Sequence, residues 1–144
     1  MQEYKFRGRR IDNGEWVHGC LTRYSDYMSY ITVDLVEGKV HQVLTATVGQ
    51  YTGLKDKCGR EIYEGDIVRC YEEDYGDEWV AKILYCADRD YPAFELEPCP
   101  DVDCNAISYY QAAGVIEVIG NVHEHRYLLD PEIQKHICSG EPPF

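Results

Sequence analysis

The stretch "YTGLKDKCGREIYEGDIV", residues 51–68, governs the interpretation of the chain because it spaces three glycines evenly between short apolar pairs. Gly53, Gly59 and Gly65 stand six residues apart. A phosphate-binding loop needs clustered glycines followed by a Lys-Ser/Thr pair that opens a helix. Here the β-branched residues of "DIV" follow Gly65 instead. The spacing therefore predicts tight turns between strands and not a phosphate site.

Two turns are expected inside this stretch. Asp56-Lys57-Cys58-Gly59 has Asp at its first position and Gly at its fourth, which is typical of a type I turn. Glu64-Gly65-Asp66 is predicted to form a second turn, and the strand "IVRCY" follows it. We expect position 65 to be a glycine because of the backbone conformation that this turn requires.

A first hairpin is predicted upstream, around Asn13-Gly14, since this dipeptide suits a type I′ turn with positive φ at both central residues. A turn centred there pairs Ile11 with Trp16 and Phe6 with Leu21. Alternation then places two sets of side chains on opposite faces. The apolar set is expected to face the core and the basic set to be exposed. The sets are Phe6, Val17 and Leu21, and Arg7, Arg9 and His18.

The remaining elements are also mostly strands. A second hairpin is predicted around Glu37-Gly38, with Ile31, Val33 and Leu35 alternating with Thr32 and Asp34. "IVRCY" and "WVAKILYC" flank an acidic loop as another hairpin, and "AFELE" and "GVIEVIGNV" are further strands. The tail "DPEIQKHIC" predicts a helix, with Asp130 as its cap, Pro131 at its first position and Ile133 and Ile137 on one face. The predicted fold class is all-β, a sandwich or barrel, with one short C-terminal helix.

Charge is distributed unevenly along the 144 residues, whose net charge is −12. Residues 1–60 hold nine Lys/Arg and seven Asp/Glu, whereas residues 61–144 hold five and nineteen. A duplex-binding surface neutralises phosphates with basic side chains, so this acidic balance argues against DNA binding by the whole chain.

The seven cysteines are expected to be reduced thiols. No charged and apolar leader opens the chain, and no apolar run is long enough to span a membrane. A reducing cytoplasm is therefore the expected location. Within it, Cys70 and Cys86 are predicted to face a core as small apolar side chains.

Four residues raise the question of a zinc site. Cys99 and Cys104 lie in an irregular proline-rich segment, and His123 and His125 follow a predicted strand. They would supply four suitable ligands if they converged. The spacing is looser than the usual Cys-x₂-Cys knuckle, so surface imidazoles and free thiols are the preferred interpretation.

Three other sets are weighed in the same way. The acidic run Glu72, Glu73, Asp74, Asp77 and Glu78 lacks the order of a calcium loop and is interpreted as a solvated hairpin tip. Cys20 and His18 share a strand face without an identified orienting carboxylate. Trp16 beside Arg7 and Arg9 could stack on nucleic-acid bases, but arginines packed around a tryptophan are the simpler account. The sequence thus predicts no catalytic residue, no metal site and no cofactor.

The chain resembles the YopX family of phage and prophage proteins in three segments. These are "KFRGRRIDNGEWVHG", "TVGQYTGLKDKCGREIYEGDIV" and "VIEVIGNVHE", which occur in order between about residue 4 and residue 129. The resemblance implies a β-rich fold with an SH3-like barrel around and after "YEGDIV". It implies no established activity and no agreed binding residues.

Three parts are accordingly predicted: an N-terminal β-hairpin subdomain at 1–50, an SH3-like part at 51–129, and a C-terminal helix and tail at 130–144. The expected function is a non-enzymatic protein-interaction module in the cytoplasm of the infected bacterium. The alternative is a small nucleic-acid-binding barrel that uses the basic first hairpin. Lys5, Arg7, Arg9 and Arg10 of this hairpin, opposed to the acidic second half, also suggest a homo-oligomer.

Overall fold

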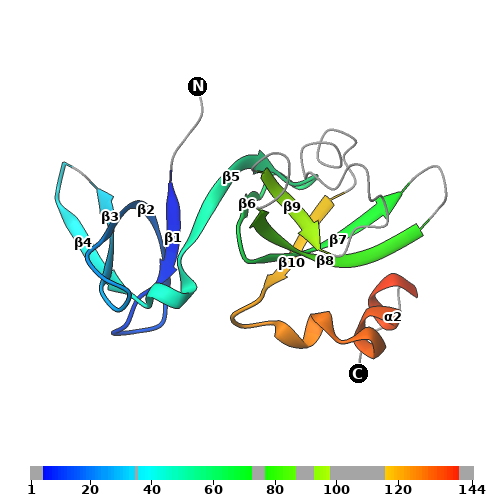
Figure 1. The fold of residues 1–144 in the computed structure, drawn as a ribbon. Helices are drawn as coiled ribbons and strands as arrows, with labels where there is room; N and C mark the ends of the chain where they lie inside the picture. The colour runs from blue at the N-terminus through cyan, green and yellow to red at the C-terminus, as the bar shows by residue number, and fades with distance from the viewer. Residues whose placement is uncertain (1–4, 35, 73–76, 87–92, 98–115, 140–144) are drawn as a thin grey trace. The chain divides into compact units, whose positions relative to one another are not determined.

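The computed structural model of the protein describes residues 5–34, 36–72, 77–86, 93–97 and 116–139, and it divides the chain into two compact units, residues 1–53 and 54–144 (Figure 1). Short strands dominate both units. They are β1 (Phe6–Arg9), β2 (Trp16–Arg23), β3 (Ser29–Asp34), β4 (Lys39–Val43), β5 (Gly49–Lys55), β6 (Glu61–Tyr63), β7 (Asp66–Glu72), β8 (Asp77–Cys86), β9 (Ala93–Glu97) and β10 (Ile116–Asn121). Two 3₁₀ turns, η1 (Thr45–Thr47) and η2 (Arg126–Leu129), and the helix α2 (Pro131–Ser139) complete the described elements.

The first unit is an antiparallel meander in which β1 to β4 pair in chain order. β5 pairs with the other side of β1 and carries the chain into the second unit. The predicted second hairpin is confirmed, since Asp34 pairs with Lys39 and Gly38 has a φ of +69°.

The first hairpin exists, but its predicted register was wrong. Arg9 pairs with Trp16, and Phe6 pairs with Gly19 in place of Leu21. The loop is longer than a two-residue turn because Arg10 N–H donates to Glu15 O at 2.8 Å and Gly14 N–H donates to Arg10 O at 3.0 Å. Only Gly14 of the Asn-Gly pair has a positive φ, of +72°.

The far end of the meander returns to its first strand. Arg10 and Val43 form an isolated antiparallel bridge, Ile11 N–H donates to Gln42 O, and Leu44 N–H donates to Arg9 O. This return brings the apolar side chains of β3 and β4 together, and Ile31 and Val43 are fully buried. The strands thus wrap around a small core.

The second unit contains a four-stranded antiparallel sheet in the order β10-β7-β8-β9. Most buried positions of its strands carry β-branched or other apolar residues, as the sequence pattern predicts, and the buried polar exceptions are Asp66, Glu95 and Asn121. One buried cluster is Ile62, Val68, Cys70, Ala81, Ile83, Leu96 and Ile116. The predicted core position of Cys70 is confirmed, whereas the side chain of Cys86 lies outside the described residues. Closure of this unit into an SH3-like barrel stays a prediction.

Both turns of the opening stretch are confirmed. Gly59 N–H donates to Asp56 O at 3.0 Å, as in a type I turn. Gly65 has a φ of +92°, a conformation that side chains rarely adopt. Asp66, which is 2 % exposed, accepts a hydrogen bond from Tyr63 N–H at 2.8 Å. The glycines and acids of this stretch therefore serve the backbone.

The C-terminal helix is also confirmed. Asp130 Oδ1 accepts from Glu132 N–H at 2.8 Å, which caps the first turn, and Pro131 is the first helical residue. Ile133 and Ile137 pack against a buried cluster that includes Ile67. Across the described residues the fold is all-β with a short C-terminal helix, as predicted. No helix in this part of the chain is long and apolar enough to cross a membrane.

Candidate functional site

The sheet of the first unit presents a face that its small core does not use. Thr22 pairs with Tyr30, and Thr32 pairs with Val40. Residues directly opposite each other on neighbouring strands share a face, so these four side chains lie together. Ile31 lies between Tyr30 and Thr32 and points to the other face, where it is fully buried. We call the face that carries Tyr30 and Thr32 the outer face.

A groove of about 460 Å³ lies on the outer face. It is lined by Thr22, Tyr24, Met28, Tyr30, Thr32 and Val40. Tyr24 is 72 % exposed, and Met28 and Val40 are also exposed. The rings of Tyr24 and Tyr30 meet edge to face, with their centroids 5.5 Å apart and an interplanar angle of 85°. The lining is thus aromatic and aliphatic, with hydroxyl groups on four of its six side chains.

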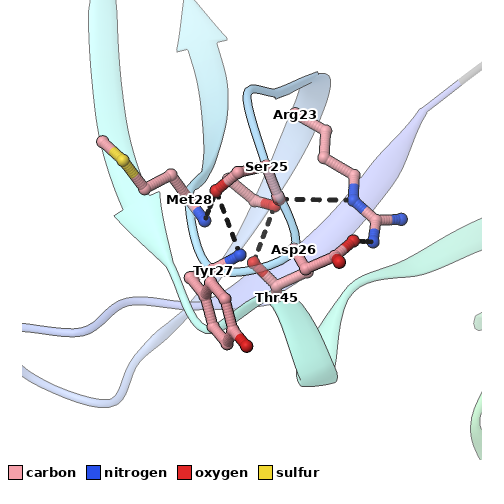
Figure 2. A network of polar contacts seen from close by, with 7 residues as sticks. Arg23, Ser25, Asp26, Tyr27, Met28 and Thr45 are labelled. Carbon is pink, nitrogen blue, oxygen red and sulfur yellow. Dashed lines mark hydrogen bonds and ion pairs between the residues drawn. The ribbon is translucent and has the colours of Figure 1, made fainter.

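The loop between β2 and β3 is held by Ser25 (Figure 2). Ser25 Oγ accepts hydrogen bonds from Tyr27 N–H at 3.2 Å and Met28 N–H at 3.1 Å. Tyr24 N–H donates to Met28 O at 2.9 Å, which closes the loop. Arg23 donates to Ser25 O at 3.5 Å and to Asp26 Oδ1 at 2.9 Å. These contacts fix the backbone that presents Tyr24 and Met28 to the groove.

The start of β3 is held by a contact with η1. Ser29 is fully buried, and its hydroxyl is 2.9 Å from the hydroxyl of Thr45 in η1. This contact fixes the Ser29 side chain, because leaving a buried hydroxyl without a partner costs free energy. The strand that carries Tyr30 and Thr32 therefore begins at a fixed position.

Three ion pairs join charged side chains of the first unit. Arg23 pairs with Asp26 at 2.9 Å, Lys39 Nζ lies 3.2 Å from Glu37, and Arg10 lies 2.6 Å from Asp12. The Arg10 hydrogen bond lowers the pKa of the Asp12 carboxyl, and the same bond raises the pKa of Arg10. Residues 1–53 contain six Lys/Arg and six Asp/Glu and carry no net charge.

The predicted exposure of the basic hairpin was wrong for Arg7. This residue is buried at 9 % exposure, and its guanidinium lies 4.8 Å from the centroid of the Trp16 ring. Lys5 Nζ lies over the Tyr51 ring at 5.1 Å, and Arg9 Nε donates to Gly14 O at 3.2 Å. The stacking of Arg7 on Trp16 matches the simpler of the two interpretations of this cluster.

The four residues of the zinc hypothesis are placed only in part. Cys99 and Cys104 lie outside the described residues. His125 Nδ1 accepts a hydrogen bond from Asn121 N–H at 3.1 Å, so this nitrogen already has a structural role. His123 is exposed. The described part of the chain contains no group of three His, Cys, Asp or Glu side chains arranged to hold a metal ion.

The other sets from the sequence are scattered. Within the acidic run, Glu78 pairs with Arg69 at 3.0 Å, while Glu73 and Asp74 and the side chains of Glu72 and Asp77 lie outside the described residues. Cys20 and His18 are both exposed on the outer face of β2.

Sequence reasoning missed the groove altogether. The signal was present in the alternation of β3, since Tyr30 and Thr32 had to oppose buried Ile31. Reading the pairing of β3 with β4 from the Glu37-Gly38 turn would have added Val40 to Tyr30 and Thr32, whereas the place of Thr22 depends on the loop between β2 and β3. Tyr24 and Met28 lie in the loop, where alternation carries no information.

Comparison with known proteins agrees with this fold. The crystal structure of protein EF1440 from Enterococcus faecalis matches with a TM-score of 0.56 and 26 % sequence identity, over 90 % of this chain and 100 % of that chain. No curated protein matches the sequence. The family model described as YopX protein matches residues 5–130. The chain therefore belongs to the YopX family.

Proposed function

We propose that this chain is a non-enzymatic interaction module that binds a partner protein through the groove on the outer face of its first unit. The observation that carries the proposal is the exposure of Tyr24, Met28 and Val40 around one hollow. Exposed apolar side chains are ordinary when they are scattered, but a contiguous patch marks an interaction surface. Tyrosine is also among the residues that supply most binding energy at protein interfaces.

The rigidity of the groove supports the same function. Ser25 accepts hydrogen bonds from two backbone amides of the loop, and β3 begins at the contact between buried Ser29 and Thr45. A surface that is already ordered loses less conformational entropy on binding. The backbone that carries Tyr24 and Tyr30 is therefore already ordered before a partner binds.

The alternative, a nucleic-acid-binding barrel, draws on the basic first hairpin. Binding of a phosphate backbone requires cationic groups that release counterions. Arg7 is stacked on Trp16 and buried, and Arg10 is paired with Asp12. The neutral first unit thus offers little positive potential, and the observations favour a protein partner.

The remaining parts of the proposal concern context. We also propose that the protein acts in the cytoplasm of a phage-infected bacterium. We also propose that the protein self-associates, which would cover exposed sheet edges. Light scattering is its test: an oligomer has a multiple of the 16.7 kDa chain mass, whereas a 16.7 kDa species at tens of micromolar contradicts it.

Affinity capture with matched variants tests the central proposal. Tyr24→Ala removes a ring from the groove, and Tyr27→Ala removes a ring of equal size from the same loop, 87 % exposed and outside the groove lining. Parent protein and Tyr27→Ala are expected to retain a bacterial protein that Tyr24→Ala retains weakly. A partner that all three proteins retain equally, or no retained partner, contradicts the proposal.

A further inference from the structure

We propose that the groove accepts an uncharged, proline-containing segment in an extended polyproline II conformation. This inference deepens the proposed function and rests on it. Its basis is the shape and chemistry of the six lining residues, together with the charge state of their surroundings.

The first feature that bears on the ligand is the charge of the groove lining. All six lining residues are uncharged. The ionic side chains nearest in sequence, Arg23 and Lys39, pair with Asp26 and Glu37. A charged ligand side chain entering the groove would lose hydration and find no opposite charge in the lining, which costs free energy. The contacting part of the partner is therefore uncharged.

The second feature is the arrangement of the two aromatic rings in the lining. Tyr24 and Tyr30 both line the groove, and their rings meet edge to face, with centroids 5.5 Å apart and an interplanar angle of 85°. Grooves lined by aromatic rings recognise proline-rich segments, because the flat pyrrolidine ring packs against an aromatic face. Met28 and Val40 add aliphatic surface to the same hollow.

The third feature is the set of hydroxyl groups in the lining, which can donate hydrogen bonds. A polyproline II segment has no internal hydrogen bonds, so its carbonyl groups need external donors. The lining offers hydroxyl donors on Thr22, Tyr24, Tyr30 and Thr32. Proline has no backbone N–H, so a proline segment makes no corresponding demand for acceptors.

The fourth feature is the length of the groove lining across the strands. The lining spans β2, β3 and β4 through the pairs Thr22–Tyr30 and Thr32–Val40. Two spacings between neighbouring strands cover about 10 Å, which matches about one turn of polyproline II at ~3.1 Å per residue. An amphipathic helix is itself about 10 Å wide and needs anchors over two turns or more, so it fits this hollow poorly.

Two capped synthetic peptides test the inference. One is a nonapeptide of Pro, Leu and Ala with proline at every third position, and the other has alanine at those positions. Fluorescence anisotropy measures binding, and backbone amide shifts locate it. We expect the proline peptide to bind more tightly and to shift Thr22, Tyr30 and Thr32. Equal binding of the two peptides, or no binding of either, overturns the inference.

Two matched pairs of variants place the binding in the groove. Tyr24→Ala is expected to weaken the proline peptide by at least about tenfold, whereas Tyr27→Ala changes its affinity by less than about twofold. Val40→Glu places a carboxylate in the lining, and Val36→Glu places one at a fully exposed position outside it. Val40→Glu is expected to weaken binding and Val36→Glu to leave it unchanged. Equal effects within either pair refute the assignment.

The two proposals fail in distinguishable ways. If a captured partner depends on Tyr24 but binds equally well after its prolines are replaced by alanine, the inference is wrong and the interaction module stands. If no partner depends on Tyr24, the proposed function itself is wrong.

Discussion

The side-chain carboxylate of Asp56 accepts a hydrogen bond from the backbone N–H of Val118, 2.9 Å away and 62 residues later in the chain. Its other oxygen accepts from Cys58 N–H and Arg60 N–H, each at 2.9 Å. Asp56 is buried, so water has little access to this carboxylate. The predicted type I turn after β5 is thus joined to the strand β10 by the side chain of Asp56.

Replacing this carboxylate is expected to destabilise the second unit. Asp56→Ala leaves three backbone donors without their acceptor and should lower the free energy of unfolding by about 3 kcal/mol. The control is Asp26→Ala, because Asp26 is highly exposed and its surface ion pair is worth about 1 kcal/mol or less. Urea unfolding measures both. A loss of stability for Asp56→Ala no larger than that for Asp26→Ala would show that the hydrogen bonds of Asp56 contribute little to the free energy of unfolding.

Close approach of strands at Gly19 provides a second prediction. A Cβ at Gly19 would lie 2.1 Å from the backbone oxygen of Thr32, whereas a Cβ at Gly38 would meet nothing within 4 Å. Gly38→Ala pays only for its positive φ, on the order of 1 kcal/mol. Gly19→Ala must separate β2 from β3 and should cost considerably more. Thermal melts that rank the two variants in the opposite order contradict the described strand approach.

Ser25 should control the order of the loop that carries Tyr24 and Met28. Ser25→Ala removes the acceptor for Tyr27 N–H and Met28 N–H, while Ser25→Thr keeps a hydroxyl oxygen there. Hydrogen exchange at these two amides is expected to accelerate in the alanine variant and to remain slow in the threonine variant. Unchanged exchange in Ser25→Ala would mean that the loop is ordered by other contacts.

The Arg10–Asp12 contact makes a prediction about pH. Arg10 lowers the pKa of Asp12 in the folded chain, so this pair favours folding above the ordinary pKa of an aspartate. That contribution is lost as the pH falls through the lowered pKa. An NMR titration of the Asp12 carboxyl should show a midpoint below that of Arg10→Ala. Identical midpoints would mean that the ion pair does not persist in solution.

Turns and caps were the features that the sequence predicted best, because their chemistry is local. Asp56 and Gly59 define a type I turn through their own positions, and Asp130 and Pro131 begin the helix in the same way. The first hairpin was harder. Asn13 uses its side chain to accept from Glu15 N–H at 2.9 Å, so the Asn-Gly pair closes a longer loop and the register shifts.

The candidate site was beyond local reasoning for a different reason. The groove depends on how β2 and β4 flank β3 and on a loop whose conformation Ser25 determines. The burial of Arg7 likewise depends on Trp16 of the next strand. Strand alternation assigned Arg7 to a face, but it does not state which face another part of the fold will cover.

The most direct test of the binding groove uses two cysteines of the same chain. Cys20 pairs with Thr32 on the outer face, and Cys58 lies exposed in the turn of the second unit. Alkylation of each thiol is followed by mass spectrometry of its peptide, with the protein alone and with a partner that it retains from bacterial lysate. The account predicts that the partner slows alkylation of Cys20 several-fold and leaves Cys58 unchanged. Equal rates at Cys20 with and without a bound partner would contradict it.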